Sequence, residues 1–430
     1  MMRGNGQDPA VRIGFYSHDT LGLGHFSRCL KIAHTFARGL GRVEGVLITG
    51  LPCAGVFQAP PGHRLVRLPA VTKRGDGTYV EREAGASLAR VLAERCARIS
   101  TTIKTFAPDL FIVDNVPCGL GGEVLPSLRH LAARRGVRTV LVLRDVLDSA
   151  GVIKDEWERG EAGEALEIYD EIWVFGSRAD VEAMVESGPL GTVASKVVAC
   201  GALPSPPSAR RETPGLLVEC DEAPGALPVR SAAQSLPTEE SSGEGTSERS
   251  RPRIIVTGGG GKDAHALVRS YLDALRMFRP AVSSRIVLGP DFPEETLREL
   301  TAHNGFEACI DRFVPDLAAE IAQADAVVSM AGYNTVCEVR AAGCPALLVP
   351  RVRPRREQWL RACALAEVGL VKVEHPEAID ARSLWLAVEE LLESPAPRPQ
   401  ALPGGHAALA RAGRLLGTEP RQPTFTESLH

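Results

Sequence analysis

The 430-residue sequence lacks most of the features that would assign a function at first sight. No apolar run approaches the length of a membrane span, and the polar first ten residues contain no signal-peptide core. The net charge of −4 excludes the basic excess typical of nucleic-acid binding, so we expect no nucleic-acid partner. The ten cysteines are scattered without a Cys-x-x-Cys pair, which favours buried, reduced thiols in a cytoplasmic protein. A peripheral contact with the inner face of the membrane stays open.

The usual signatures of nucleotide and metal sites are also missing. The sequence has neither the GxxxxGK[ST] spacing of a P-loop nor a GxGxxG fingerprint followed by an acidic residue at the expected place. No Asp-x-Asp pair follows a predicted strand, so we predict no metal requirement and no resident cofactor.

What the sequence does contain is an alternation of strand-like and helical stretches, and this alternation occurs twice. A hydrophobic content of 44% can fill two cores, although aromatic residues make up only 5%. Continuous apolar strands between helices are typical of parallel sheets covered on both faces. The predicted strands are 11–17, 43–49, 63–68, 110–114, 139–144, 172–175, 253–257, 285–288, 308–312, 326–329, 346–349 and 370–373, and the predicted helices include 26–40, 84–105, 383–392 and 406–416.

The two series of elements predict two Rossmann-like α/β domains. We expect a first domain over residues 1–203 and a second over 253–394, with a tail containing one helix at 395–430. Between the domains, residues 204–252 are rich in Pro, Ser, Glu and Gly, which predicts a disordered linker or insertion. In such folds ligands bind beyond the carboxyl ends of the strands, so the active site is expected in the cleft between the domains.

The first candidate site follows the first predicted strand. Gly22 and Gly24 would let a substrate approach the backbone, and His25 at the start of the next helix could act as a general base near neutral pH. A histidine that only hydrogen-bonds its own loop would explain the same position. Asp114 ends a buried strand and could orient His25, and the pair Arg144-Asp145 ends the next strand.

Three further candidates lie in the second half. Four glycines after strand 253–257 resemble a phosphate cradle, and a flexible turn is the alternative interpretation. An Ala-Gly pair opens the helix after strand 326–329, where backbone N–H groups suit an anion and a following carboxylate suits a sugar diol. A charged stretch after strand 346–349 offers groups for sugar hydroxyls or simply a solvated helix start. These candidates comprise Gly258, Gly259, Gly260, Gly261, Ala331, Gly332, Thr335, Glu338, Glu357 and Gln358.

Taken together, residues from about 253 to 392 resemble the nucleotide-sugar-binding domain of glycosyltransferase family 28. The most specific part is Ser329-x-Ala-Gly-x-x-Thr-x-x-Glu338, with Glu357-Gln358 further on and Arg312-Phe-Val-Pro-Asp-Leu317 upstream. The resemblance implies a GT-B fold. It also implies that the nucleotide base lies against Phe313 and the backbone of Val314, that Glu338 binds the ribose, and that Gln358 contacts the donor sugar. Arg361 stands where the family has Asn, a departure that bears on the sugar.

The first half resembles the same family more loosely, through the glycine loop and the proposed base His25. The implied activity is inverting, metal-independent transfer of a sugar from a nucleoside-diphosphate sugar, in particular a UDP-sugar, which is a co-substrate rather than a cofactor. The acceptor stays undetermined among a polysaccharide, a lipid-linked sugar and a small metabolite. Two alternatives remain. The stretch from Gly22 to Arg28 also resembles nucleotide-sugar hydrolases of the same fold, and a non-catalytic sugar-nucleotide-binding protein would carry the same donor residues.

Overall fold

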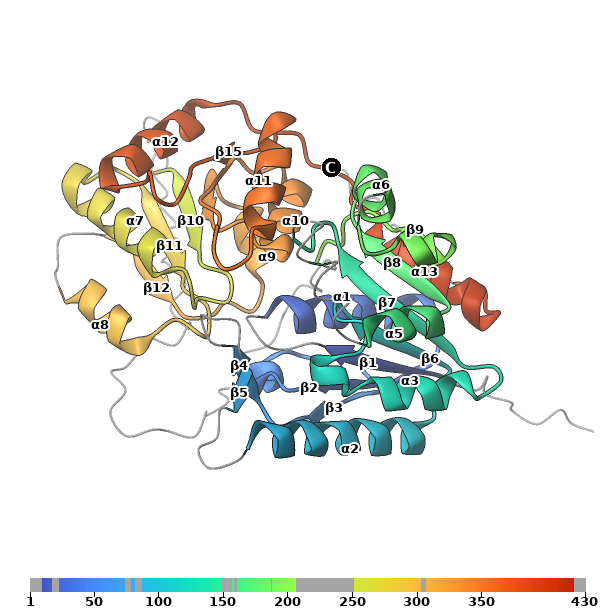
Figure 1. The fold of residues 1–430 in the computed structure, drawn as a ribbon. Helices are drawn as coiled ribbons and strands as arrows, with labels where there is room; N and C mark the ends of the chain where they lie inside the picture. Colours follow the sequence, from blue (N-terminus) through green and yellow to red (C-terminus); the bar gives the residue numbers. More distant parts are fainter. Residues whose placement is uncertain are drawn as a thin grey trace, which may run out of the picture.

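The computed structural model describes residues 10–17, 23–73, 79–81, 87–148, 153, 157, 161–186, 188–205, 251–302 and 307–420. Gly22 of the predicted glycine loop and residues 206–250 of the predicted linker therefore lie outside the described residues. The described chain forms two α/β units, each built on a parallel sheet (Figure 1).

The first sheet has seven described strands in the order β3-β2-β1-β6-β7-β8-β9, and all of its neighbours are parallel. The order reverses between β1 and β6, which is where ligands bind in sheets of this kind. The strands are β1 (Val11–Ser17), β2 (Val43–Thr49), β3 (His63–Arg67), β6 (Leu110–Asp114), β7 (Arg138–Arg144), β8 (Glu171–Phe175) and β9 (Val197–Ala199), and a small antiparallel pair comprises β4 (Val71–Lys73) and β5 (Tyr79–Glu81).

Helices cover both faces of this sheet because its central strands are apolar on both sides. Every residue of β6 is buried, and one hydrophobic cluster lies on each face. Helix α1 packs on one face and α2 on the other (Figure 1). The helices of this unit are α1 (Gly24–Gly39), α2 (Leu88–Phe106), α3 (Leu125–Ala132), α5 (Ala162–Ile168) and α6 (Arg178–Glu186).

The second sheet repeats this arrangement with six described strands in the order β12-β11-β10-β13-β14-β15, all parallel, and its order reverses between β10 and β13. Its strands are β10 (Arg253–Thr257), β11 (Ser283–Val287), β12 (Cys309–Asp311), β13 (Ala326–Ser329), β14 (Ala346–Leu348) and β15 (Lys372–Val373). Its helices are α7 (His265–Phe278), α8 (Glu294–Thr301), α9 (Leu317–Ile321), α10 (Tyr333–Ala342), α11 (Glu357–Glu367) and α12 (Ala381–Glu393).

The last helix, α13 (Gly404–Leu416), returns to the first unit instead of packing on the sheet that precedes it. It lies against α1, and Ala408, Leu409 and Ala412 join the hydrophobic cluster of the first sheet (Figure 1, red). The backbone N–H of Gly404 also donates to the carbonyl of Ala202 at 2.9 Å. The chain therefore crosses between the units twice, which ties them together covalently at two points.

The predicted elements agree closely with these bounds. Strands β1, β2, β6, β10 and β13 begin and end where the sequence predicts, and most other ends shift by one or two residues. Helix α2 was predicted from residue 84, but it begins at Leu88 because the Ser87 side chain accepts from the backbone N–H of Arg90 and caps the helix there. The sequence pattern does not predict β4, β5, β9, α3, α5 or α6.

Candidate active site

The carboxyl ends of both sheets meet at a cavity of about 1270 Å³, which is lined by residues of both units. This volume exceeds that of a typical small-ligand pocket, so the cavity has room for more than one small substrate. The first unit contributes the start of α1 and the ends of β6 and β7. The second contributes the loops after β10 and β13, the start of α10 and the segment before α11.

On the first unit's wall, His25 lies beside Asp114. The Nδ1 atom of His25 is 2.6 Å from Oδ2 of Asp114. Arg28, one turn further along α1, donates from Nε to Oδ1 of the same carboxylate at 2.6 Å. His25 lines the cavity, whereas Asp114 is fully buried behind it and does not. The structure thus brings together the two residues that the sequence predicts as base and orienting partner.

These contacts determine the protonation of the pair. Burial would raise the pKa of Asp114, but Arg28 and His25 outweigh it and hold that pKa below its ordinary value. The ionised carboxylate accepts hydrogen bonds only, so Nδ1 of His25 carries the proton and Nε2 is left as the basic nitrogen. Burial lowers the pKa of His25, against the opposing effect of Asp114. The imidazole is therefore neutral at pH 7, as a general base requires.

On the opposite wall, the glycine run after β10 forms a tight turn. Gly259 and Gly261 adopt positive φ angles of 62° and 96°. A Cβ on Gly261 would lie 2.7 Å from the carbonyl oxygen of Leu288, so a larger residue fits neither the backbone conformation nor the space. The Thr257 hydroxyl accepts from the backbone N–H of Gly259 at 3.3 Å. All four predicted glycines, 258 to 261, line the cavity.

The start of α10 also faces the cavity. Its N-cap is Gly332, which has no side chain to bind the first N–H groups, so they are available to an anion. Gly332 and Thr335 line the cavity as predicted. Ala331 does not: it is completely buried with φ 62°, and its carbonyl accepts from Nη1 of Arg361 at 3.2 Å. The predicted role of Ala331 in contacting a ligand is therefore limited to shaping the turn.

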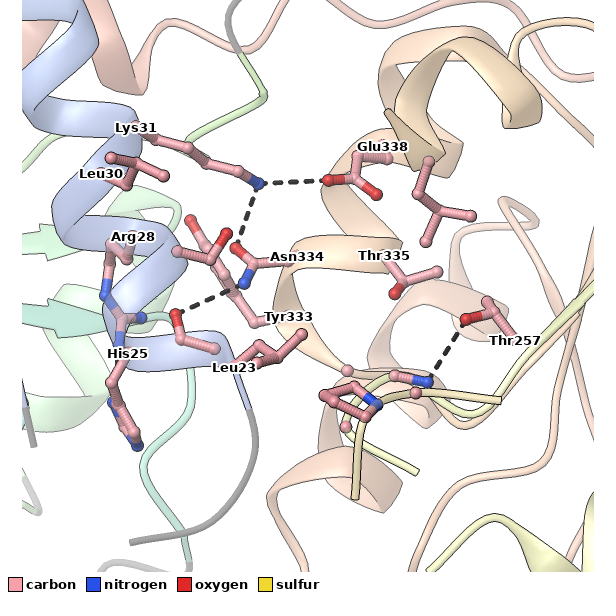
Figure 2. A pocket seen from close by; sticks show the side chains of 18 of the residues that line it. Leu23, His25, Arg28, Leu30, Lys31, Thr257, Tyr333, Asn334, Thr335 and Glu338 are labelled. Carbon is pink, nitrogen blue, oxygen red and sulfur yellow. Dashed lines mark hydrogen bonds and ion pairs between the residues drawn. The ribbon is translucent and has the colours of Figure 1, made fainter. Parts of the chain in front are cut away.

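Glu338 lies one turn further along α10 and is reached from the first unit. Its Oε1 is 3.3 Å from Nζ of Lys31 on α1 and accepts from the Ser205 hydroxyl at 2.7 Å. Lys31 also donates to Oδ1 of Asn334 at 3.1 Å (Figure 2). The carboxylate that the sequence assigns to a ribose thus has a cation from the opposite unit beside it.

Two aromatic rings from different units also meet at the cavity. Phe313, predicted to lie against a nucleotide base, has its ring centroid 5.4 Å from that of Phe57, at an interplanar angle of 80°. Both residues line the cavity, as does Val314, which follows Phe313. Phe57 belongs to the first unit, so both units contribute to this wall.

Charged residues also line the cavity. Glu357 is only 2% exposed, and its Oε1 lies 2.5 Å from Nη2 of Arg351 and 3.9 Å from Nη2 of Arg144. Burial would raise the pKa of Glu357, but Arg144 and Arg351 hold it below its ordinary value. The side chain of Gln358 accepts from the backbone N–H of Arg351 at 3.0 Å. Glu357 and Gln358 both line the cavity, as predicted.

The sequence resemblance relates Arg361 to the donor sugar, but in the structure its side chain lies at the interface between the two units. It is 2% exposed, does not line the cavity, and binds both carboxylate oxygens of Asp145 at 2.6 and 2.7 Å. Asp145 follows β7 of the first unit, so this ion pair joins the two units. The guanidinium groups of Arg361 and Arg28 each lie 5.6 Å from the ring centroid of Tyr333. Arg361 therefore acts on the interface between the units and not directly on a bound sugar.

Sequence reasoning missed several residues of this site, above all Lys31 and Asn334. Gly24, which was predicted, lines the cavity together with Arg28 and Lys31. The sequence does contain a signal for Arg28 and Lys31, because positions 25, 28 and 31 are three residues apart and lie on one face of a helix. No comparable signal marked Asn334, whose partner Lys31 lies 303 residues away in the sequence.

Within the described part of the chain, no group of three or more His, Cys, Asp or Glu residues could hold a metal ion. Among the same residues no helix is long and apolar enough to cross a membrane. The nine described cysteines are free thiols.

Comparison with known proteins identifies the second unit. A family model for the glycosyltransferase family 28 C-terminal domain matches residues 253–403. Residues 253–403 are a glycosyltransferase family 28 C-terminal domain. The match includes every donor-side residue predicted from the sequence, and the family 28 domain ends within the segment that leads to α13.

A curated relative is also similar to this chain. The UDP-N-acetylglucosamine–N-acetylmuramyl-(pentapeptide) pyrophosphoryl-undecaprenol N-acetylglucosamine transferase of Sodalis glossinidius is 32% identical over 154 residues. The aligned stretch is 34% of this chain and 40% of that protein. The chain thus spans about two fifths of the length of this relative.

Solved structures show that the whole chain, with the family 28 domain as its second half, has the GT-B fold of two facing Rossmann-like domains. The alignment with the structure of MurG from Acinetobacter baumannii covers 95% of this chain and 99% of that protein, with a TM-score of 0.54 and 15% sequence identity. The alignment with LpCGTa, whose structure was solved in complex with UDP, covers 95% of this chain and 94% of that protein, with a TM-score of 0.52 and 15% sequence identity.

Proposed function

We propose that the protein is an inverting, metal-independent glycosyltransferase that moves a sugar from a nucleoside-diphosphate sugar, specifically a UDP-sugar, to an acceptor hydroxyl. The observation that carries the proposal is a single cavity shared by the donor residues of the family 28 domain and the His25–Asp114 pair of the first domain. The UDP choice is supported by the printed name of the Sodalis relative and by the UDP complex of LpCGTa.

In this proposal the donor extends across the second domain. The base lies against Phe313 and the backbone of Val314, and the ribose hydroxyls bind Glu338. The diphosphate meets the N–H groups of residues 258–261 and of the α10 N-terminus, and the sugar reaches Glu357 and Gln358. Residues 1–203 bind the acceptor, residues 253–394 bind the donor, and 204–252 connect them. We place the reaction in the cytoplasm, at the inner face of the membrane if the acceptor is lipid-linked.

The chemistry uses the basic nitrogen of His25. Nε2 takes the proton of the acceptor hydroxyl while the hydroxyl oxygen attacks the anomeric carbon of the donor sugar. The attack comes from the side opposite the diphosphate, so the configuration at the anomeric carbon inverts. The bond to the diphosphate breaks, and the leaving group departs with the electron pair. Amide N–H groups and the dipole of α10 stabilise the developing negative charge. Asp114 holds the imidazole in the required tautomer and stabilises the imidazolium that forms.

The test is the release of UDP from a panel of UDP-sugars, measured with and without mixtures of oligosaccharide, lipid-linked and small-molecule acceptors. We expect release that depends on an acceptor, and a loss of about 100-fold or more in kcat for His25→Ala. His265→Ala, an exposed histidine on α7, is the matched control. Full turnover by His25→Ala would contradict the base assignment.

The same assay separates the alternatives. Release at a rate that no acceptor increases would identify a nucleotide-sugar hydrolase, in which water replaces the acceptor. Binding of a UDP-sugar without any turnover, under all acceptor mixtures, would identify a non-catalytic binding protein.

A further inference from the structure

Arg144, the last residue of β7, lies on the cavity wall with its charge incompletely compensated. Within the described residues its ion-pair partner is Glu357, at 3.9 Å, which is the limit of an ion pair. Its Nε is buried and has no hydrogen-bond partner. The Arg144 side chain is 22% exposed, but its buried Nε–H is costly to leave without a partner unless a ligand completes its hydrogen bonds.

The neighbouring arginines differ from Arg144 because each has a close carboxylate. Arg28 binds Asp114 at 2.6 Å, and Arg361 binds both oxygens of Asp145. The third, Arg351, binds Glu357 at 2.5 Å and Asp263 at 2.9 Å, and so holds the oxygen of Glu357 that is nearest to Arg144. Each of these three arginines therefore has a carboxylate oxygen at 2.5 to 2.7 Å, whereas the carboxylate contact of Arg144 among the described residues is at 3.9 Å. The other oxygen of Glu357, Oε2, is buried without a hydrogen-bond partner.

Arg144 belongs to the wall that holds the proposed base. Strand β7 is paired with β6, which ends in Asp114. Arg144 is close enough to His25 for its charge to lower the pKa of the imidazole. Burial lowers the pKa of Arg144 itself to about 10, partly opposed by Glu357, so Arg144 stays charged at pH 7. Asn115, which follows Asp114 on the same wall, also has a side-chain oxygen without a partner.

The donor diphosphate has its own binding groups elsewhere. The glycine turn and the N-terminus of α10 lie on the opposite wall and belong to the family 28 domain. Arg144 comes from the first domain, next to the group that would deprotonate the acceptor. Arg144 therefore lies between the proposed base and Glu357, which is assigned to the donor sugar, and its position beside His25 favours an anion on the acceptor.

We propose that Arg144 binds a phosphate or carboxylate group that the acceptor carries close to its reacting hydroxyl. This inference rests on the proposed function and narrows it, because it makes the acceptor an anionic molecule whose charge lies beside the nucleophile. The side-chain oxygen of Asn115 would then accept a hydrogen bond from a hydroxyl group of the acceptor.

The test uses the protein saturated with UDP, so that the diphosphate subsite is filled. Inorganic phosphate and acetate are titrated separately, with binding followed by calorimetry, into the wild type, Arg144→Lys and Arg144→Met. Arg178→Met is the control, because Arg178 is an exposed arginine on α6. We expect one of the two anions to bind the UDP-saturated wild type and Arg178→Met. We expect Arg144→Met to bind it at least about tenfold more weakly, with UDP affinity changed less than twofold, and Arg144→Lys to retain part of the binding.

Other outcomes would overturn the proposal. If Arg144→Met weakens UDP and phosphate competes with UDP, then Arg144 serves the donor diphosphate. If neither anion binds the UDP-saturated wild type, then Arg144 does not form an anion-binding site. Failure of the proposed function is distinguishable, because the wild type would then not bind UDP at all. An NMR titration gives an independent readout of position: Arg144→Met should raise the pKa of His25, whereas Arg178→Met should not.

Discussion

Removal of one hydroxyl group, in Tyr333→Phe, should weaken the attachment between the two domains. Tyr333 opens α10 of the second domain, but it is buried in the hydrophobic cluster of the first. Its hydroxyl donates to the carbonyl of Phe175 and accepts from the N–H of Leu203, both at 2.9 Å. Phenylalanine fills the same space but leaves these two buried backbone groups without partners.

The size of the effect follows from these contacts. Each buried group left unsatisfied costs about 1–3 kcal/mol, so the two together should cost about 2–6 kcal/mol. A chain of 430 residues has an unfolding entropy of about 0.9 kcal/mol/K, so a cooperative unfolding transition should shift down by about 2–7 °C. Differential scanning calorimetry measures this shift, and a transition that splits into two would show directly that the domains have become uncoupled.

The matched control is Tyr271→Phe. Tyr271 is also fully buried, but its hydroxyl bonds to the side chain of Ser284 at 2.8 Å inside the second domain. This variant leaves one buried group unsatisfied, so it should lose about 1–3 kcal/mol and show no splitting of the transition. If Tyr333→Phe melts like the wild type, or shifts no more than Tyr271→Phe, then the hydroxyl of Tyr333 does not hold the domains together.

Three other predictions concern the base and the interface. The wild-type kcat/KM should rise with pH through a pKa below 6.5 and then stay level to about pH 8. The reason is that burial lowers the pKa of His25 and only the neutral imidazole accepts a proton. A kcat/KM that falls between pH 5 and 7 would contradict this. Leu409→Ala should cost about 2–5 kcal/mol in a denaturant titration, because Leu409 is 6% exposed between α13 and α1, whereas the half-exposed Leu386→Ala should cost little. Arg361→Met should cost about 3–5 kcal/mol by leaving Asp145 without its partner, and a loss below 1 kcal/mol would show that this ion pair does not join the domains.

Much of the fold could be predicted from the sequence, because the central strands carry a local signal. Strands such as β6 and β13 are continuous apolar runs with polar neighbours, and their bounds were predicted correctly. The docking of α13 could not be predicted, since an apolar helix face does not specify which surface it will cover. The short β9, and the antiparallel β4–β5 pair, lack runs long enough to distinguish them from loops.

The candidate site was predictable where one segment supplies it and unpredictable where two distant segments meet. The glycine turn at 258–261 and the α10 N-terminus each follow a recognisable strand, and both line the cavity. The contact of Glu338 with Lys31 joins residues 307 apart in the sequence, and no local pattern encodes such a pairing. The interface role of Arg361 was missed for the same reason, because its partner Asp145 lies 216 residues away.

The most direct test of the proposed donor site is calorimetric titration of UDP, GDP, dTDP and CDP into the wild type and Glu338→Ala. The account predicts that UDP binds preferentially, and that Glu338→Ala weakens it by about tenfold or more, because hydrogen bonds to a charged group contribute about 1.5–3 kcal/mol. Absence of binding by all four nucleotides, or equal UDP affinity in the wild type and Glu338→Ala, would contradict it.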